Sequence, residues 1–449
     1  MRCFASAVGL DVCPLVRKMK HVLVAGFLAL NILFPCVVLA EEKQEKILTG
    51  TITLVQAQQI VLLQNPGLQA YSYEVRAREA ETLQAGLTYN PNLNVQLENV
   101  AGTGNFNGVD QSETTFQLSQ RLELGNKRSL RKNSANLSKE IAGWDYEVQR
   151  LEVLTRVSQS FTNVLKAQQK ISLTVDGVQL AKKFSNAVSE RVKAGKVAAI
   201  ENIKAQVAFA NMRIKEERAR QDLKNTRRQL SILWGEAEPS FDSVQGDLFL
   251  VPDKVLPEIT TLASNPRLSK WSTTLAHRQA ELDVENSKAV PDLTLSGSYR
   301  RLEQTDDNAL VFGVTVPLNW FNRNQGGIAK ARHRLSKSQE EKRAKELSLQ
   351  EALLKVRSEV SYSHAKVISI KTEILPGAKK ALDAISEGYS FGKFGLLDVL
   401  DSQKTFFQVQ SQYLDALANY HNAVADVKRL TGMGHSAQNL EAGKGDSRP

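Results

Sequence analysis

The sequence predicts a mainly α-helical protein with a small β part, built from two copies of one helix–hairpin–helix unit. Only 12 prolines, 26 glycines and 6% aromatic residues are spread over 449 residues, which favours long helices over several compact cores. Two short segments alternate apolar and polar residues, as strands do. The third observation is an internal duplication with an offset of about 200 residues.

The duplication is clearest around two glycines. With an offset of 197 residues, AGKVAAIENIKAQ (194–206) aligns with FGKFGLLDVLDSQ (391–403). With an offset of 200 residues, Asn65-Pro66 aligns with Asn265-Pro266. We therefore expect one repeat over residues 41–240 and a second over 241–432.

The two ends of the chain are expected to lie outside the repeats. Residues 1–40 have the basic segment, apolar run and small-residue cleavage site of a signal peptide, and they contain all three cysteines. A mature chain without thiols suits an oxidising compartment. The start at Met1 or Met19 and a lipid on Cys36 are left open. The tail, 433–449, is polar and predicted to be disordered.

Each repeat is predicted to contain the same elements in the same order. The first has a helix over 51–87, a hairpin over 90–124, a long helix over 126–193, a turn at 195 and a return helix. The second has a hairpin over 290–321, a long helix over 322–390 and a turn at 392. A helix of this length spans about 100 Å. Bends are expected at Gly177 and at Pro376-Gly377.

Apolar residues recur every seven positions along both return helices. They are Ile200, Val207 and Ile214 in the first copy and Leu400, Phe407 and Leu414 in the second. This spacing is typical of helices that pack side by side in a coiled coil.

The predicted strands have the length and alternation of strands that cross an outer membrane at a tilt. Beyond residue 40 no apolar run approaches the length of a membrane-spanning helix. Four strands cannot close a barrel, and open edges are not tolerated in lipid. We therefore expect self-association; three copies would form a trimeric, 12-stranded outer-membrane β-barrel, continued by a long α-helical coiled-coil tunnel. A soluble hairpin packed on helices remains the alternative.

Charge and motifs argue against catalysis and nucleic-acid binding. Outside residues 1–40 the chain has 54 basic and 47 acidic side chains, and their signs alternate along helices as on solvated faces. The five histidines of the mature chain show no metal-ligand spacing, and no glycine-rich phosphate loop is present. No enzyme activity, cofactor, metal site or nucleic-acid partner is predicted.

The duplicated unit, the aligned pair at 194–206 and 391–403, and the run Gly388-Tyr389-Ser390-x-Gly392 resemble the TolC-like outer-membrane efflux proteins over residues 51–432. Within this family, Leu124-Gly125-Asn126-Lys127-Arg128 and the segment 321–326 are similar to the cobalt-zinc-cadmium resistance branch. The resemblance implies a homotrimer in the outer membrane with a tunnel in the periplasm. It also implies two partners, a periplasmic adaptor (membrane fusion protein) and an inner-membrane RND pump.

The resemblance also implies a periplasmic aperture. Asp398 and Asp401 match the family's ring of carboxylates, although an aspartate in a first helical turn also complements the helix dipole. Tyr389 and Glu201 match positions that hold the helix pairs together, whereas the family's basic residue falls on Phe394.

The two turns match the tips at which the family docks its adaptor. These tips comprise Gly195, Lys196 and Val197 in the first repeat and Gly392, Lys393 and Phe394 in the second. Ordinary helix termination by glycine is the alternative interpretation.

Heavy-metal cations are the expected cargo, with drugs or a polypeptide from a type I secretion system as the alternative. A periplasmic coiled-coil adaptor or scaffold is the alternative of another class.

Overall fold

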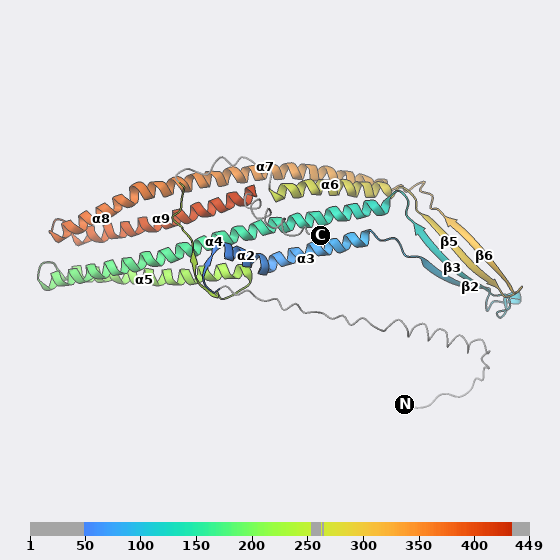
Figure 1. The fold of residues 1–449 in the computed structure, drawn as a ribbon, viewed down its shortest axis with the longest axis horizontal. Helices are drawn as coiled ribbons and strands as arrows, with labels where there is room; N and C mark the ends of the chain where they lie inside the picture. The colour runs from blue at the N-terminus through green and yellow to red at the C-terminus, as the bar shows by residue number, and fades with distance from the viewer. Residues whose placement is uncertain (1–48, 253–261, 263–264, 433–449) are drawn as a thin grey trace, which may run out of the picture. The chain divides into compact units, whose positions relative to one another are not determined.

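The structure of the chain is a computed structural model that describes residues 49–252, 262 and 265–432. The elements described here belong to one compact unit, Leu48–Pro449 (Figure 1). The predicted signal peptide and tail lie outside the described residues. The first repeat contains β1 (Gly50–Thr53), α2 (Leu54–Gln64), α3 (Pro66–Ala85), β2 (Asn92–Glu98), η1 (Gly104–Phe106), β3 (Glu113–Leu122), α4 (Lys127–Lys193), α5 (Ala199–Ser231) and η2 (Ile232–Trp234).

The second repeat contains the corresponding elements in the same order. They are β4 (Phe241–Gln245), α6 (Pro266–Ser287), β5 (Leu293–Leu302), β6 (Asp307–Thr315), α7 (Gln325–Ser369), the π-helical segment η3 (Ile370–Ile374), α8 (Leu375–Ser390) and α9 (Leu396–Thr431). The described residues are therefore mostly helical with a small amount of sheet, as predicted.

The long helices pack side by side. Helix α4 has 67 residues and lies between α5 and α9, while α9 also packs against α7 and α8 (Figure 1). Because β3 leads directly into α4, the hairpins and the turns lie at opposite ends of a helix about 100 Å long.

The two expected bends have different outcomes. Helix α4 runs through Gly177 without interruption, so the glycine does not break it. A Cβ atom at Gly177 would lie 2.3 Å from Met212 Cε and 2.8 Å from the Phe407 ring. Gly177 therefore permits close helix packing. In the second repeat, η3 directly precedes α8, whose second residue is Pro376, and this proline has no N–H to bond the carbonyl of the preceding turn.

The helix predicted over 51–87 begins later than expected and is divided. Residues 50–53 form β1, which pairs in parallel with β4, and the sequence pattern missed both strands. The break falls at Asn65-Pro66, the pair of residues that both repeats share. Asn65 Oδ1 accepts a hydrogen bond from Leu68 N at 2.9 Å, and Asn65 Nδ2 donates to Leu233 O at 2.6 Å. The aligned Asn265 makes the matching bond to Leu430 O at 2.7 Å.

The hairpins join into one antiparallel sheet in the order β2-β3-β5-β6. Its register aligns Val95, Phe116, Tyr299 and Leu310 in one row across the four strands, and all four side chains are exposed. The sheet therefore has one apolar face, and its edge strands are β2 and β6.

The two return helices differ in whether the apolar side chains that recur every seven residues are buried. Leu414 is 6% exposed, which agrees with the predicted packing. Ile200, Val207 and Ile214 are 53, 55 and 68% exposed, because α5 packs on α4 through a different face that includes Ala205 and Ala219. The predicted contact of these three residues is therefore absent within the described part of this chain.

Candidate functional site

The two glycine turns have the same backbone geometry. Gly195 and Gly392 have φ values of +69° and +75°, which favour glycine. Lys196 N donates to Arg191 O at 2.9 Å, and Lys393 N donates to Gly388 O at 2.8 Å. Each glycine thus ends its long helix with the hydrogen-bond pattern of a left-handed helix cap.

The structure brings Tyr389 and Glu201 into contact. Tyr389 is 7% exposed, and its hydroxyl donates to Glu201 Oε2 at 3.2 Å. The Arg191 guanidinium lies 4.4 Å from the Tyr389 ring centroid and donates to the Tyr389 carbonyl at 3.0 Å. Phe184 packs on the same ring with a centroid distance of 5.6 Å. Side chains of the first repeat therefore hold the end of α8.

Sequence reasoning missed Arg191. The two repeats differ at this position, since one has an arginine and the other a glycine. With the offset of 197 residues, Arg191 aligns with Gly388 and Val192 aligns with Tyr389. The Phe394 ring occupies the space beside Gly388, where a Cβ atom would lie 2.4 Å from it. A basic residue does contact Tyr389, but it comes from α4 and not from the position of Phe394.

The two predicted aperture carboxylates are exposed on the first turns of α9. Asp398 Oδ2 accepts a hydrogen bond from Gly395 N at 2.8 Å, so this side chain caps the helix. Asp401 has no hydrogen-bond or ion-pair partner among the described residues. Among the described residues, no hydrogen bond or ion pair joins either aspartate to Tyr389 or Glu201.

The predicted tips are largely open to solvent. Lys196 and Lys393 are exposed, and Phe394 is 46% exposed. Val197 is half-buried, although a residue that docks a partner at a tip is expected to be exposed. The nearby Phe391 is 70% exposed, so the second turn presents more apolar surface than the first.

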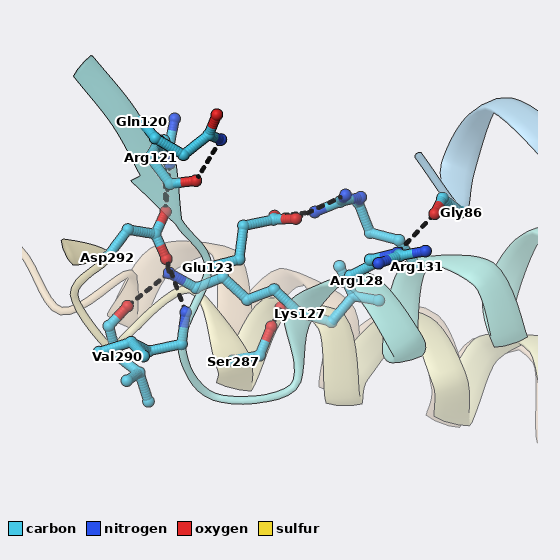
Figure 2. A network of polar contacts seen from close by, with 12 residues as sticks. Gly86, Gln120, Arg121, Glu123, Lys127, Arg128, Arg131, Ser287, Val290 and Asp292 are labelled. Atoms are coloured by element: carbon cyan, nitrogen blue, oxygen red, sulfur yellow. Dashed lines mark hydrogen bonds and ion pairs between the residues drawn. The ribbon is translucent and has the colours of Figure 1, made fainter. Parts of the chain in front are cut away.

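A second cluster lies where the strands lead into α4 (Figure 2). Asp292 directly precedes β5 and is 6% exposed. It accepts hydrogen bonds from Arg121 Nε at 2.8 Å, Lys127 Nζ at 2.5 Å and Leu124 N at 3.3 Å. A buried carboxylate of the second repeat therefore holds the strand-to-helix entry of the first.

Neighbouring contacts extend this junction, which Figure 2 shows from close by. Arg131 forms an ion pair with Glu123, and Arg128 Nε donates to Gly86 O at 2.5 Å. Sequence reasoning identified the entry segment but missed its partner Asp292. The first repeat has Asn92 at the position that aligns with Asp292. This change from asparagine to aspartate is the only hint in the sequence alignment that Asp292 has a role of its own.

The entry to α7 uses a different set of contacts. Asn126 and Asn324 both adopt left-handed conformations, with φ of 57° and 59°, one residue before their helices. Asn324 Nδ2 donates to Glu285 Oε2 at 2.6 Å. Hydrogen bonds from Lys288 and Asn324 lower the pKa of Glu285. Both strand-to-helix entries are thus held by an acidic residue of the second repeat that lies close to the strands, Asp292 for α4 and Glu285 for α7.

The described part of the chain offers no metal centre and no helical membrane anchor. No group of three or more His, Cys, Asp or Glu side chains there is placed to hold a metal ion. No helix in this part has both the length and the apolar character needed to cross a membrane.

Comparisons with known proteins agree with this architecture. The family model for the outer membrane efflux protein matches residues 57–236 and 260–433. The cobalt-zinc-cadmium resistance protein CzcC of Cupriavidus metallidurans is 34% identical over 385 residues, covering 85% of this chain and 90% of CzcC. The nickel-cobalt-cadmium resistance protein NccC of Alcaligenes xylosoxydans is 24% identical over 297 residues, covering 65% of this chain and 68% of NccC.

The solved structure of CusC has the same fold. It superposes with a TM-score of 0.73 at 14% sequence identity and covers 85% of this chain and 93% of CusC. The duplicated helix–hairpin–helix architecture, the family match and these relatives lead to one conclusion: this chain belongs to the outer membrane efflux protein family, whose members are transport components and not enzymes.

Proposed function

We propose that this protein is the outer-membrane exit duct of a tripartite efflux system that exports heavy-metal cations. The observation that carries the proposal is the four-stranded sheet, which has exposed apolar residues on one face and two unpaired edges. Three copies would supply twelve strands, pair every edge and place the apolar faces against outer-membrane lipid. The helices would then continue the barrel as a tunnel into the periplasm.

Exposed apolar residues on α5 support self-association. Ile200, Val207 and Ile214 form a stripe that this chain leaves uncovered among its described residues. A seven-residue spacing suits packing against a helix of another copy. This stripe and the sheet edges both favour a homotrimer over a periplasmic adaptor or scaffold, for which an open apolar sheet would be a liability.

The turns are proposed to be the periplasmic end of the tube. Phe394, Lys196 and Lys393 are exposed there, which suits docking of a periplasmic adaptor that recruits an inner-membrane RND pump. Val197 contributes less apolar surface than the second turn does. The glycines Gly195 and Gly392 set the shape of these tips.

The metal cargo is proposed from the relatives, two of which are named as cobalt, zinc, cadmium or nickel resistance proteins. A strain that lacks this protein should lose tolerance to cobalt, zinc and cadmium while keeping its tolerance to drugs. Unchanged metal tolerance would contradict the metal cargo, and a selective loss of drug tolerance or polypeptide secretion would support the alternative.

Asp398 and Asp401 are proposed to form two stacked rings of negative charge at the entrance of the trimer, which would attract cations. Asp401→Asn removes one ring without touching the helix cap, whereas Asp398→Asn keeps an oxygen to accept from Gly395 N. We expect each variant to weaken the block of the reconstituted pore by divalent cations several-fold, because the local charge falls by three. Single-channel recording measures this block, and block that matches the unmodified protein would remove both residues from the entrance.

A further inference from the structure

A groove of about 520 Å³ lies where α4, α5 and α9 meet, away from the turns and the strands. Its lining is strongly basic. Lys170 comes from α4, Lys215 and Arg218 come from α5, and Lys404 comes from α9. The lining includes a single carboxylate, Asp222, so the groove has a net charge of about three positive units.

These four cations lack ionic partners in the described part of the chain. None of them forms an ion pair there, whereas Lys166, one turn before Lys170 on α4, pairs with Asp415 at 3.3 Å. Lys170 is half-buried, and its Nζ contacts Ser411 Oγ, an uncharged acceptor. Burial lowers the pKa of Lys170. The negative charge of Asp415 raises this pKa, whereas the positive charges of Lys215 and Lys166 lower it further. An anion in the groove would relieve this repulsion.

The groove also has an apolar part. Leu173, Met212 and Phe407 line it beside the charged groups. Gly177 lets Met212 and Phe407 approach the backbone of α4, since a Cβ atom at this position would overlap both side chains. A ligand that fills this space would therefore contact an apolar surface as well as the cations.

On α4 and α9, the groove residues lie on a different side of each helix from the residues that contact segment 241–252. On α4, Gln168 hydrogen-bonds Val244 of β4, whereas Lys170 lies two residues further along, about 200° around the helix. On α9, the Tyr413 ring contacts the Phe249 ring with a centroid distance of 6.1 Å. Ser411 precedes Tyr413 by two residues and therefore lies about 200° from it around the helix.

We propose that this groove binds a small organic anion that carries two or more carboxylate or phosphate groups on an apolar body. The separated cations on three helices suit an anion with more than one charged group, and the volume lies in the range of small-molecule sites. The apolar residues favour an organic ligand over a simple inorganic ion.

Binding of naphthalene dicarboxylate to the full-length protein in detergent tests the proposal. Isothermal titration calorimetry at fixed ionic strength should detect saturable binding. The double variant Lys215→Gln/Arg218→Gln should lower the affinity about tenfold, because it removes two charge contacts of up to about 0.7 kcal/mol each. Both side chains are exposed, so the variant is expected to fold, and circular dichroism checks this.

The matched control is Lys204→Gln/Arg213→Gln, which removes the same two charges from exposed positions of α5 outside the groove. We expect the control to bind like the unmodified protein. Equal weakening by both variants, equally tight binding of inorganic pyrophosphate, or no saturable binding would each overturn the proposal. The measurement needs neither a membrane nor a pump, so its failure is distinct from failure of the proposed export function.

Discussion

Tyr389 joins the end of α8 to the first repeat through three kinds of contact. Its hydroxyl donates to Glu201, its ring lies under the Arg191 guanidinium, and its carbonyl accepts from the same guanidinium. Because the ring is 7% exposed, these contacts form with little competition from water. Tyr389 therefore lies where its contacts can limit the separation of α8 from α4 and α5 near the turns.

Tyr389→Phe tests this role at the level of one hydroxyl group. The variant keeps the ring on Arg191 but loses a hydrogen bond to a carboxylate that contributes about 1 kcal/mol. Backbone amides at 388–393 should exchange hydrogen roughly fivefold faster, because local opening becomes easier. Tyr362→Phe, which changes a tyrosine that is 62% exposed on α7, is the control. Equal exchange in both variants would exclude a role for the Tyr389 hydroxyl.

The same contact predicts a pH dependence. Burial raises the pKa of the Tyr389 phenol above its ordinary value of 10.0, and the charge of Glu201 raises it further while Arg191 opposes this. A raised pKa means that the stabilisation is fully present below pH 10.0 and is lost as the pH rises through the folded-state value. The difference in tyrosinate absorbance between the unmodified protein and Tyr389→Phe should titrate above pH 10.0. A midpoint at or below that pH would contradict the buried, Glu201-facing environment.

At the scale of elements, the two repeats use the same backbone plan with different side chains at their junctions. Periodicity and the duplication predicted the hairpins, the long helices and the turns, since these depend on local patterns. The short strands β1 and β4 were missed because Gly50–Thr53 is too short to show a period and pairs with residues about 190 positions away. Arg191 and Asp292 were missed for a similar reason, because their partners lie in the other repeat.

Gly177 is the case in which local propensity and packing disagree. A glycine inside a helix suggests a break, but α4 continues through Gly177, and the Met212 and Phe407 side chains occupy the space where a Cβ atom would lie. The exposed fraction of Val197 and of the α5 stripe also depended on tertiary packing. Patterns within one segment do not contain this information.

Gly177→Ala should therefore destabilise the protein by about 1–3 kcal/mol, because the added methyl group overpacks the contact with Met212 and Phe407. Gly143→Ala lies in the same helix where a Cβ atom meets nothing within 4 Å, and it should stabilise by about 0.5–1 kcal/mol. Denaturant unfolding followed by circular dichroism compares the two. Stabilisation by both substitutions would mean that Gly177 does not serve close packing.

At the scale of the whole molecule, the described part of one chain leaves several apolar and unpaired surfaces uncovered. Its sheet has two unpaired edges at β2 and β6, its apolar face is exposed, and α5 presents an uncovered apolar stripe. The proposed association of identical copies around one axis would cover all these surfaces, because it would pair edge with edge and helix with helix. The family match agrees with an outer-membrane efflux role for such an assembly.

The mass of the full-length protein extracted from outer membranes in mild detergent tests this account most directly. Native mass spectrometry should find three chains in one complex, and heating should convert this complex to single chains. A stable single chain that stays in aqueous solution without detergent would contradict the account, because the exposed sheet face and its open edges would then need no partner.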